Sequence, residues 1–155
     1  MSRARFTEIL KYLRFDIKNE RKHLLKTDKF ALISTTWNAF IENCKKAYVS
    51  FPYVTIDEQL LPCKARCKFI QYMANKPDKF GIKFFLAVDV QNKYMFNAVP
   101  YLGKDEGRKS DISLPTHVVM TLMEPLFGKG YNVTCNNYFT SVNLMKNLCS
   151  KNAVC

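Results

Sequence analysis

The stretch that decides the fold of this chain is Tyr53-Val54-Thr55-Ile56-Asp57-Glu58-Gln59-Leu60-Leu61. Val54 and Ile56 alternate with outward-facing neighbours, which is the period-two pattern of a strand with one buried face. The pattern predicts a strand over residues 53–57 that ends at Asp57. A carboxylate held rigidly by a buried strand suits binding of a divalent metal ion. The alternative is an acidic strand end that meets only water.

Two amphipathic helices precede this strand. The first is indicated by apolar residues at positions i, i+3, i+4 and i+7, namely Phe6, Ile9, Leu10 and Leu13. The second carries a longer apolar stripe that we assign to packing in a core, made of Phe30, Ile33, Trp37, Phe40, Ile41, Cys44 and Tyr48. Pro52 then stops helical structure before the strand begins.

After the opening strand we expect three more strands and two helices. Two of these strands, 82–89 and 93–102, form a hairpin with its turn at Gln91-Asn92. Pro115 begins a helix behind Ser113 or Leu114, and a strand covers 131–135. Thr140 or Ser141 caps a last helix. The residues expected to face inward from these helices are Val118, Val119, Leu122, Met123 and Leu126, and then Val142, Met145, Leu148 and Cys149.

This order of elements predicts an α/β fold, in which functional sites lie at the carboxyl ends of strands. Asp57 and Asp89 each stand at the end of a predicted strand, and Asn136 follows the strand 131–135. Several carboxylates from neighbouring strands are needed to hold two Mg²⁺ ions for phosphoryl transfer. An amide offers one neutral oxygen, so Asn136 cannot balance a metal ion as a carboxylate does.

The charge of the chain indicates a polyanionic partner. Its 155 residues carry 24 Lys and Arg against 13 Asp and Glu, a formal net charge of +11. Residues 62–83 hold six basic residues and one acidic residue, interleaved with Phe69, Tyr72 and Phe80. Such a mixture favours contacts to a nucleic-acid backbone, although a solvated basic surface or a loop over the core explains the composition equally well. The predicted phosphate contacts are Lys64, Arg66, Lys68, Lys76, Lys79 and Lys83.

The remaining sequence signals exclude some classes of protein. No apolar run is long enough to cross a bilayer, and no apolar segment follows the basic start, so we expect neither a membrane partner nor a signal peptide. Only Cys63 and Cys67 lie close together among six cysteines, and no second pair stands at zinc-finger spacing. We therefore expect reduced, structural thiols.

Several segments, in order, resemble a known family. They are Met1-Ser2-Arg3, Arg5-Phe6, Leu13-Arg14-Phe15, Asp57-Glu58-Gln59-Leu60, Gln71-Tyr72-Met73, Asn75-Lys76-Pro77, Gly81-Ile82-Lys83, Tyr101-Leu102-Gly103-Lys104, Gly128-Lys129-Gly130-Tyr131 and Asn137-Tyr138-Phe139-Thr140-Ser141. Together they resemble the piggyBac-type transposase domain over nearly the whole chain. Ala65 and Ala74 depart from the family pattern, which usually has Gly and Pro at these positions.

The resemblance implies an RNase H-like catalytic core (51–155) behind a helical DNA-binding and dimerisation segment (1–50), in a nuclear protein that cuts and rejoins DNA with Mg²⁺ at TTAA sites. Three aspartates hold the metal in the family. The first matches Asp57, the second falls on Asn136, and the third lies beyond Cys155, as do a further strand and its helices. Asp89 matches a frequent family aspartate outside this triad.

The resemblance therefore predicts a degenerate, truncated transposase that has kept one metal ligand, Asp57, and is inactive in strand cleavage. It would retain binding to the DNA backbone, and an open edge at the strand 131–135 would favour self-association. Two alternatives remain open. One is an active transposase completed by sequence beyond residue 155, and the other is a non-enzymatic module that binds a partner such as a full-length transposase.

Overall fold

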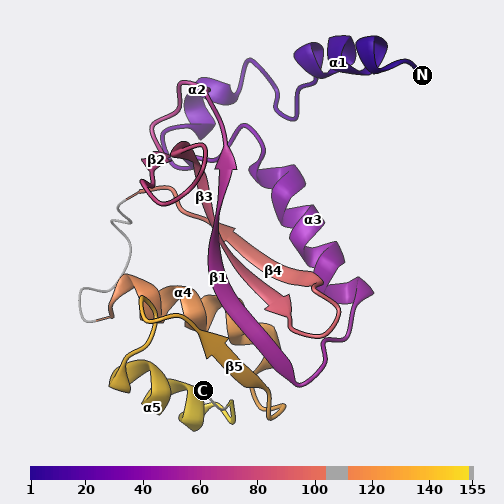
Figure 1. The fold of residues 1–155 in the computed structure, drawn as a ribbon. Helices are drawn as coiled ribbons and strands as arrows, with labels where there is room; N and C mark the ends of the chain where they lie inside the picture. Colours follow the sequence, from indigo (N-terminus) through magenta and orange to yellow (C-terminus); the bar gives the residue numbers. More distant parts are fainter. Residues whose placement is uncertain (104–111, 154–155) are drawn as a thin grey trace. The chain divides into compact units, whose positions relative to one another are not determined.

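The computed structural model describes residues 1–103 and 112–153. Lys104 and most of the polar segment 103–111 lie outside the described residues, as does Cys155. The chain forms two compact units, Met1–Phe40 and Ile41–Cys155, which are described separately (Figure 1). In the described part of the chain, no helix has both the length and the apolar character required to cross a membrane.

The first unit contains α1 (Arg3–Tyr12), α2 (Arg21–Leu24) and the start of α3 (Ser34–Ala47). Ser2 begins α1 by accepting a hydrogen bond from the backbone N–H of Arg5 at 3.3 Å, an N-cap interaction. The apolar stripe predicted for this helix is present, but α1 buries none of its residues, and Phe6 is half exposed. In the stripe predicted around α3, Phe30, Ile41 and Cys44 are buried whereas Phe40 is exposed.

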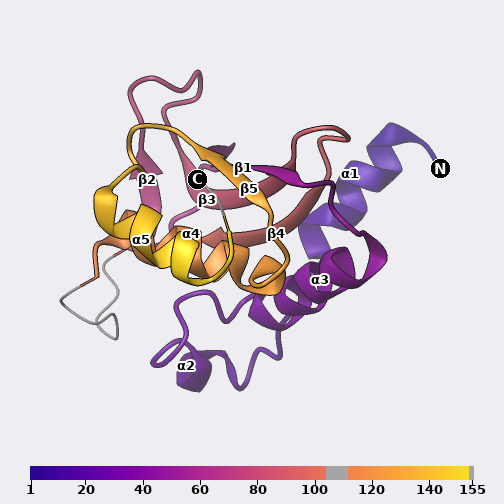
Figure 2. The same cartoon turned by 90° about the horizontal axis from the view of Figure 1, so that it is seen from below.

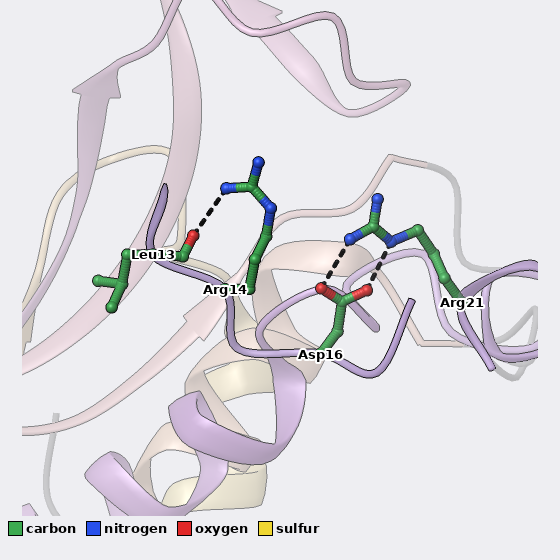
Figure 3. Close-up of polar contacts among 4 residues, drawn as sticks. All are labelled: Leu13, Arg14, Asp16 and Arg21. Carbon is green, nitrogen blue, oxygen red and sulfur yellow. Dashed lines mark hydrogen bonds and ion pairs between the residues drawn. The ribbon is translucent and has the colours of Figure 1, made fainter. Parts of the chain in front are cut away.

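An ion pair orders the connection between α1 and α2. Arg21 donates to both carboxylate oxygens of Asp16, through Nε at 2.5 Å and through a terminal nitrogen at 2.8 Å (Figure 3). This hydrogen bond from Arg21 outweighs desolvation and holds the pKa of Asp16 below its usual value. Arg14 donates to the carbonyl of Leu13 at 2.8 Å in the same segment. A stretch without hydrophobic periodicity is thus organised by a bidentate charged contact.

The second unit is built on one sheet. Its strands are β1 (Tyr53–Pro62), β2 (Ile70–Tyr72), β3 (Phe80–Asp89), β4 (Met95–Pro100) and β5 (Asn132–Cys135). The hydrogen-bonded order is β2–β3–β1–β5, and β4 also pairs with β3. β3 is antiparallel to β1, β2 and β4, whereas β5 runs parallel to β1. An α/β arrangement is therefore confirmed.

Two strand predictions need correction. Asp57 does not end its strand, because the β1–β3 ladder continues for five more residues, to Pro62 opposite Gly81. Residues 70–72, for which the sequence predicts no strand, form β2 (Ile70–Tyr72) against β3. Such a short strand shows no detectable period in sequence, and it exists because the edge of β3 offers it backbone partners.

Helices α4 (Leu114–Met123) and α5 (Val142–Ser150) lie together against one face of the sheet (Figure 2), and the short helix η1 (Glu124–Leu126) follows α4. The inward residues predicted for the α4 region are all buried. Ser113 caps α4, and Ser141 caps α5 by accepting from the N–H of Leu144 at 3.1 Å.

The face predicted for α5 is largely wrong. Leu144 and Leu148 are fully buried, whereas Val142 is 67% exposed and Met145 and Cys149 are also exposed. The buried pair is spaced i, i+4, so one narrow stripe meets the core. This core joins Val54 and Ile56 of β1 to residues of β3, β5, α4 and α5. Because side chains alternate along a strand, Asp57 lies on the other face of the sheet.

Candidate functional site

Asp57 and Asn136 lie side by side where the parallel ladder between β1 and β5 ends. The ladder pairs Tyr53 with Asn132 and closes with Ile56 opposite Cys135. The next residue of β1 is Asp57, and the residue after β5 is Asn136. The Asn136 Nδ2 donates to Asp57 Oδ1 at 3.2 Å, and both residues are exposed. The structure therefore brings the two predicted site residues together.

The orientation of the Asn136 amide follows from its other contacts. Its Oδ1 accepts the backbone N–H of Tyr138 at 3.0 Å, and its carbonyl accepts the Thr140 hydroxyl at 3.1 Å. Because Oδ1 is engaged by a donor, Nδ2 is the amide atom that faces Asp57. Asp57 Oδ1 also accepts the N–H of Glu58 at 2.8 Å. Asn136 thus both starts the loop to α5 and presents a hydrogen-bond donor to the carboxylate.

These donors do not fit the two-metal site that the family resemblance implies. Mg²⁺ takes oxygen ligands, and a pair of ions needs several carboxylates. The structure places one carboxylate, Asp57, beside an amide that turns its nitrogen toward it. In residues 1–103 and 112–153, no three His, Cys, Asp or Glu side chains gather as metal ligands would.

Lys83 lies near this pair and is half-buried. Its ammonium is 4.7 Å from the ring centroid of Phe85 and 5.1 Å from that of Tyr138, distances at which a cation is attracted to an aromatic face. Burial lowers the pKa of Lys83, and the carboxylate of Glu58 partly offsets this effect. Lys83 is therefore more enclosed than the surface cation expected from sequence.

Lys76 also reaches toward the middle of β1. Its ammonium is 3.5 Å from the carbonyl oxygen of Glu58, and it contributes to the lowered pKa of Lys83, after burial. Two of the six predicted cations are thus close to the Asp57 segment. The arrangement therefore places two ammonium groups near an exposed carboxylate, one of them over the ring of Tyr138.

The other predicted cations lie on the loops around β2. Lys64, Arg66 and Lys68 are exposed in the segment between β1 and β2, and Lys79 is exposed just before β3 with a positive φ of 53°. The structure therefore divides the predicted set into an inner pair and an outer group of four. Of the aromatic residues in this region, Phe69 is buried, whereas Tyr72 and Phe80 are exposed.

Asp89 is not part of the site, although it ends β3. Because β3 is antiparallel to β1, Asp89 pairs with Val54, three positions and roughly 10 Å before Asp57. Its carboxylate is fully buried and accepts bonds from Ser50 Oγ at 3.0 Å and from the N–H groups of Phe51, Gln91 and Asn92 at 2.6–2.8 Å. Burial alone would raise the pKa of Asp89, but these bonds together lower it to about 2.

Sequence reasoning missed the contact of Tyr138 with Lys83 and the role of Asp89 in the hairpin turn. The contact of Tyr138 with Lys83 depends on how the loop after β5 returns over β3, which the residues of one strand do not reveal. The signal available for Asp89 was its place one residue before a three-residue turn, where an Asp side chain readily accepts backbone N–H groups.

Comparisons with known proteins identify the family of this fold and site. A family model described as Transposase IS4 matches residues 1–155. The human PiggyBac transposable element-derived protein 3 and the human chimeric ERCC6-PGBD3 protein are each 29% identical over 97% of this chain, which spans 25% and 14% of their lengths. A piggyBac transposase chain, solved by cryo-EM in a synaptic complex with hairpin DNA, superposes with a TM-score of 0.91 and 39% identity, covering 99% of this chain and 32% of that one. This chain therefore belongs to the family of piggyBac-type transposase domains.

Proposed function

We propose that this chain is a piggyBac transposase-derived DNA-binding segment that does not catalyse strand cleavage. The observation that carries the proposal is the amide of Asn136, whose nitrogen faces Asp57 Oδ1 at 3.2 Å. The family resemblance expects a second carboxylate at this position. A neutral donor there removes one negative charge and turns a hydrogen-bonding N–H₂ toward the place where a metal ion would be held.

The energetic argument concerns the charge that develops during phosphoryl transfer. Two metal ions clamp the attacking and leaving oxygens, and their positive charge stabilises the transition state. Losing one such stabilising group typically lowers the rate constant by about 10²–10³-fold. Asp57 keeps its carboxylate but faces the amide nitrogen of Asn136, and we propose that it does not hold Mg²⁺ productively.

Binding to the DNA backbone is supported by the charge of residues 62–83. The outer group of four cations is exposed, and the inner pair of Lys76 and Lys83 lies near Asp57. Lysine and arginine on such loops bind phosphates without reading sequence, and this binding weakens as salt rises. The solved piggyBac transposase, determined in a synaptic complex with hairpin DNA, also supports DNA as the partner.

We further propose that the sheet is part of an RNase H-like core. Support comes from the order β2–β3–β1–β5, with β5 parallel to β1 and β3 antiparallel to it. The division into a helical DNA-binding and dimerisation segment (1–50) and a core (51–155), the nuclear location, and association with a second copy or a full-length transposase remain proposals that rest on the family.

The catalytic part of the proposal is tested with DNA that carries an element end, incubated with the chain and Mg²⁺ or Mn²⁺. We expect no metal-dependent strand cleavage. Isothermal titration of the same sample with MnCl₂ should show no tight site. Cleavage that requires the metal and disappears in Asp57→Ala would overturn the proposal and favour the active alternative.

The DNA-binding part is tested by reversing three charges, Lys64→Glu, Arg66→Glu and Lys68→Glu, in one variant. Loss of three phosphate contacts should flatten the slope of log K against log salt by up to about 2.7 for duplex DNA. The matched control reverses three exposed lysines around α5: Lys129, Lys146 and Lys151. Equal weakening in both variants would point to net charge alone, and unchanged binding in the first would exclude the loop as the contact.

A further inference from the structure

Two exposed aromatic rings stand side by side at one end of the sheet. Tyr72 and Phe80 are opposite each other in the β2–β3 ladder, with ring centroids 5.0 Å apart and ring planes inclined by 50°. Tyr72 is 59% exposed and Phe80 is 55% exposed. A single exposed ring needs no explanation, but a contacting pair with open faces is a surface that a ligand can use.

The backbone holds this pair in place. Met73 donates to the carbonyl of Lys79 at 2.7 Å and closes the loop between the two strands. In the ladder position next to the rings, Gln71 pairs with Gly81, and Gly81 also pairs with Pro62 of β1. The rings are therefore carried by a ladder connected to the central strand, so little conformational entropy remains to be lost when a ligand binds.

The pair shares a sheet face with Asp57. Leu61 and Ile82 are opposite each other in the β1–β3 ladder, so their side chains project to the same face. Asp57 is four residues from Leu61 on β1, and Phe80 is two residues from Ile82 on β3. Because side chains alternate along a strand, Asp57 and Phe80 project to that same face. Phe80 lies six positions along the ladder from Asp57, about 20 Å at 3.3 Å per residue. This spacing corresponds to about six base-pair steps of DNA.

The charges around the pair select the kind of ligand. Loops on both sides of β2 carry the outer group of cations, and Lys79 immediately precedes Phe80. Residues 62–83 have a net charge of +5, from six basic residues and one acidic residue. A ligand that satisfies both features is a polyanion with flat apolar faces. In a duplex these faces are covered by neighbouring base pairs, so an unpaired nucleotide fits the site best.

We infer that Tyr72 and Phe80 form a stacking site for an unpaired base, and that the cations beside them hold the flanking phosphates of a single-stranded DNA segment. This inference rests on the proposed DNA-binding function and adds the form of DNA that the chain prefers. A DNA with a duplex part and a single-stranded end would place its unpaired bases on the rings and its backbone along the face that carries Asp57.

The inference is tested with the full chain and two fluorescent DNAs of equal length. One is a blunt duplex, and the other has a six-nucleotide single-stranded overhang that contains 2-aminopurine, whose fluorescence falls when it stacks. The wild type should bind the overhang DNA more tightly than the duplex and quench its fluorescence. Phe80→Leu and Tyr72→Leu should each weaken overhang binding about 5-fold or more, with loss of quenching. Tyr72→Phe, which keeps the ring, should behave like the wild type.

The control is Tyr53→Leu, which removes a ring that is 61% exposed at the other end of β1. It should change neither DNA affinity nor quenching. If both leucine variants of the pair keep wild-type quenching and preference, the inference is wrong, even where the charge reversal at 64, 66 and 68 still weakens duplex binding. If that charge reversal has no effect on either DNA, the proposed function itself fails. Circular dichroism verifies that each variant is folded.

Discussion

The Asn136 Nδ2 donates to Asp57 Oδ1 across 3.2 Å, where the parallel ladder between β1 and β5 ends. Asn136→Asp replaces this contact with two carboxylates at nearly the same separation. Repulsion and the lost hydrogen bond should lower the free energy of unfolding at neutral pH by about 1 to 2 kcal/mol. A divalent ion that binds both carboxylates should reverse the loss, because a ligand that binds only the folded state stabilises it. Thermal unfolding measured with and without MnCl₂ tests both effects.

Asn137→Asp is the matched control, since it adds the same charge at the next exposed position. It should show neither the loss of stability nor the rescue by Mn²⁺. If Asn136→Asp is no more sensitive to Mn²⁺ than this control, then position 136 does not face a metal-binding place, and the explanation of inactivity by this residue is wrong.

Asp89 has a structural role at the turn between β3 and β4. Asp89→Asn should destabilise the fold by about 3 kcal/mol. The amide nitrogen of Asn cannot accept the hydrogen bonds that backbone N–H groups now donate to the buried carboxylate. Urea unfolding measures the change. Asp78→Asn, which alters an exposed residue near the β2–β3 loop, should stay within about 0.5 kcal/mol of the wild type. Comparable losses in both variants would contradict the assignment.

The same residue predicts a pH dependence. The pKa of Asp89 is lowered from 3.8 to about 2, so the unfolded chain takes up this proton at a higher pH than the folded chain does. The stability that the carboxylate provides is complete above about pH 4 and is lost as the pH falls toward 2. The difference in unfolding free energy between the wild type and Asp89→Asn should therefore shrink over this interval. A constant difference between pH 5 and pH 2 would exclude Asp89 as its source.

Sequence patterns predicted the elements of the sheet better than their ends and directions. The alternation of Val54 and Ile56 located β1, but the strand continues to Pro62 because β3 supplies backbone partners along its whole length. The same antiparallel pairing places Asp89 beside Val54 at the start of β1, three positions before Asp57. Direction and register are tertiary properties, and no local pattern in either strand encodes them.

The site was predicted in part. The family resemblance selected Asp57 and Asn136, which are 79 residues apart in the sequence, and the structure brings them into contact. It gave no information on the surroundings of Lys83, whose burial between two aromatic rings depends on how the loop after β5 returns over β3. Contacts between side chains of different elements can be identified only when the arrangement of those elements in space is known.

The buried face of α5 can be tested directly, since its prediction from sequence was mostly wrong. Leu144→Ala should destabilise the fold by about 2 to 5 kcal/mol, because it removes a fully buried side chain from the core. Met145→Ala, at an exposed neighbouring position of the same helix, should cost less than about 1 kcal/mol. Thermal or urea unfolding compares the two. Equal losses would mean that α5 does not present Leu144 to the core.

Gly81 connects the stacking pair to the central strand, and its small size is required by the close approach of β1. A Cβ at this position would lie 2.2 Å from the carbonyl oxygen of Leu61 and 3.0 Å from the Leu60 Cγ. Because the nearest obstacle is backbone, the strands must move apart to admit it. Gly81→Ala should therefore cost about 1 to 3 kcal/mol in urea unfolding.

The same variant should also weaken amide-exchange protection along β1, β2 and β3, because Gly81 pairs with both Pro62 and Gln71. Gly130→Ala provides the contrast. Its added Cβ meets nothing within 4 Å, but its φ of +71° is strained for alanine, so it should lose about 1 kcal/mol and leave protection of the β1–β3 ladder unchanged. If Gly81→Ala retains wild-type exchange in that ladder, the close approach of Leu61 does not constrain the sheet. The argument that a rigid ladder holds Tyr72 and Phe80 in place would then also be wrong.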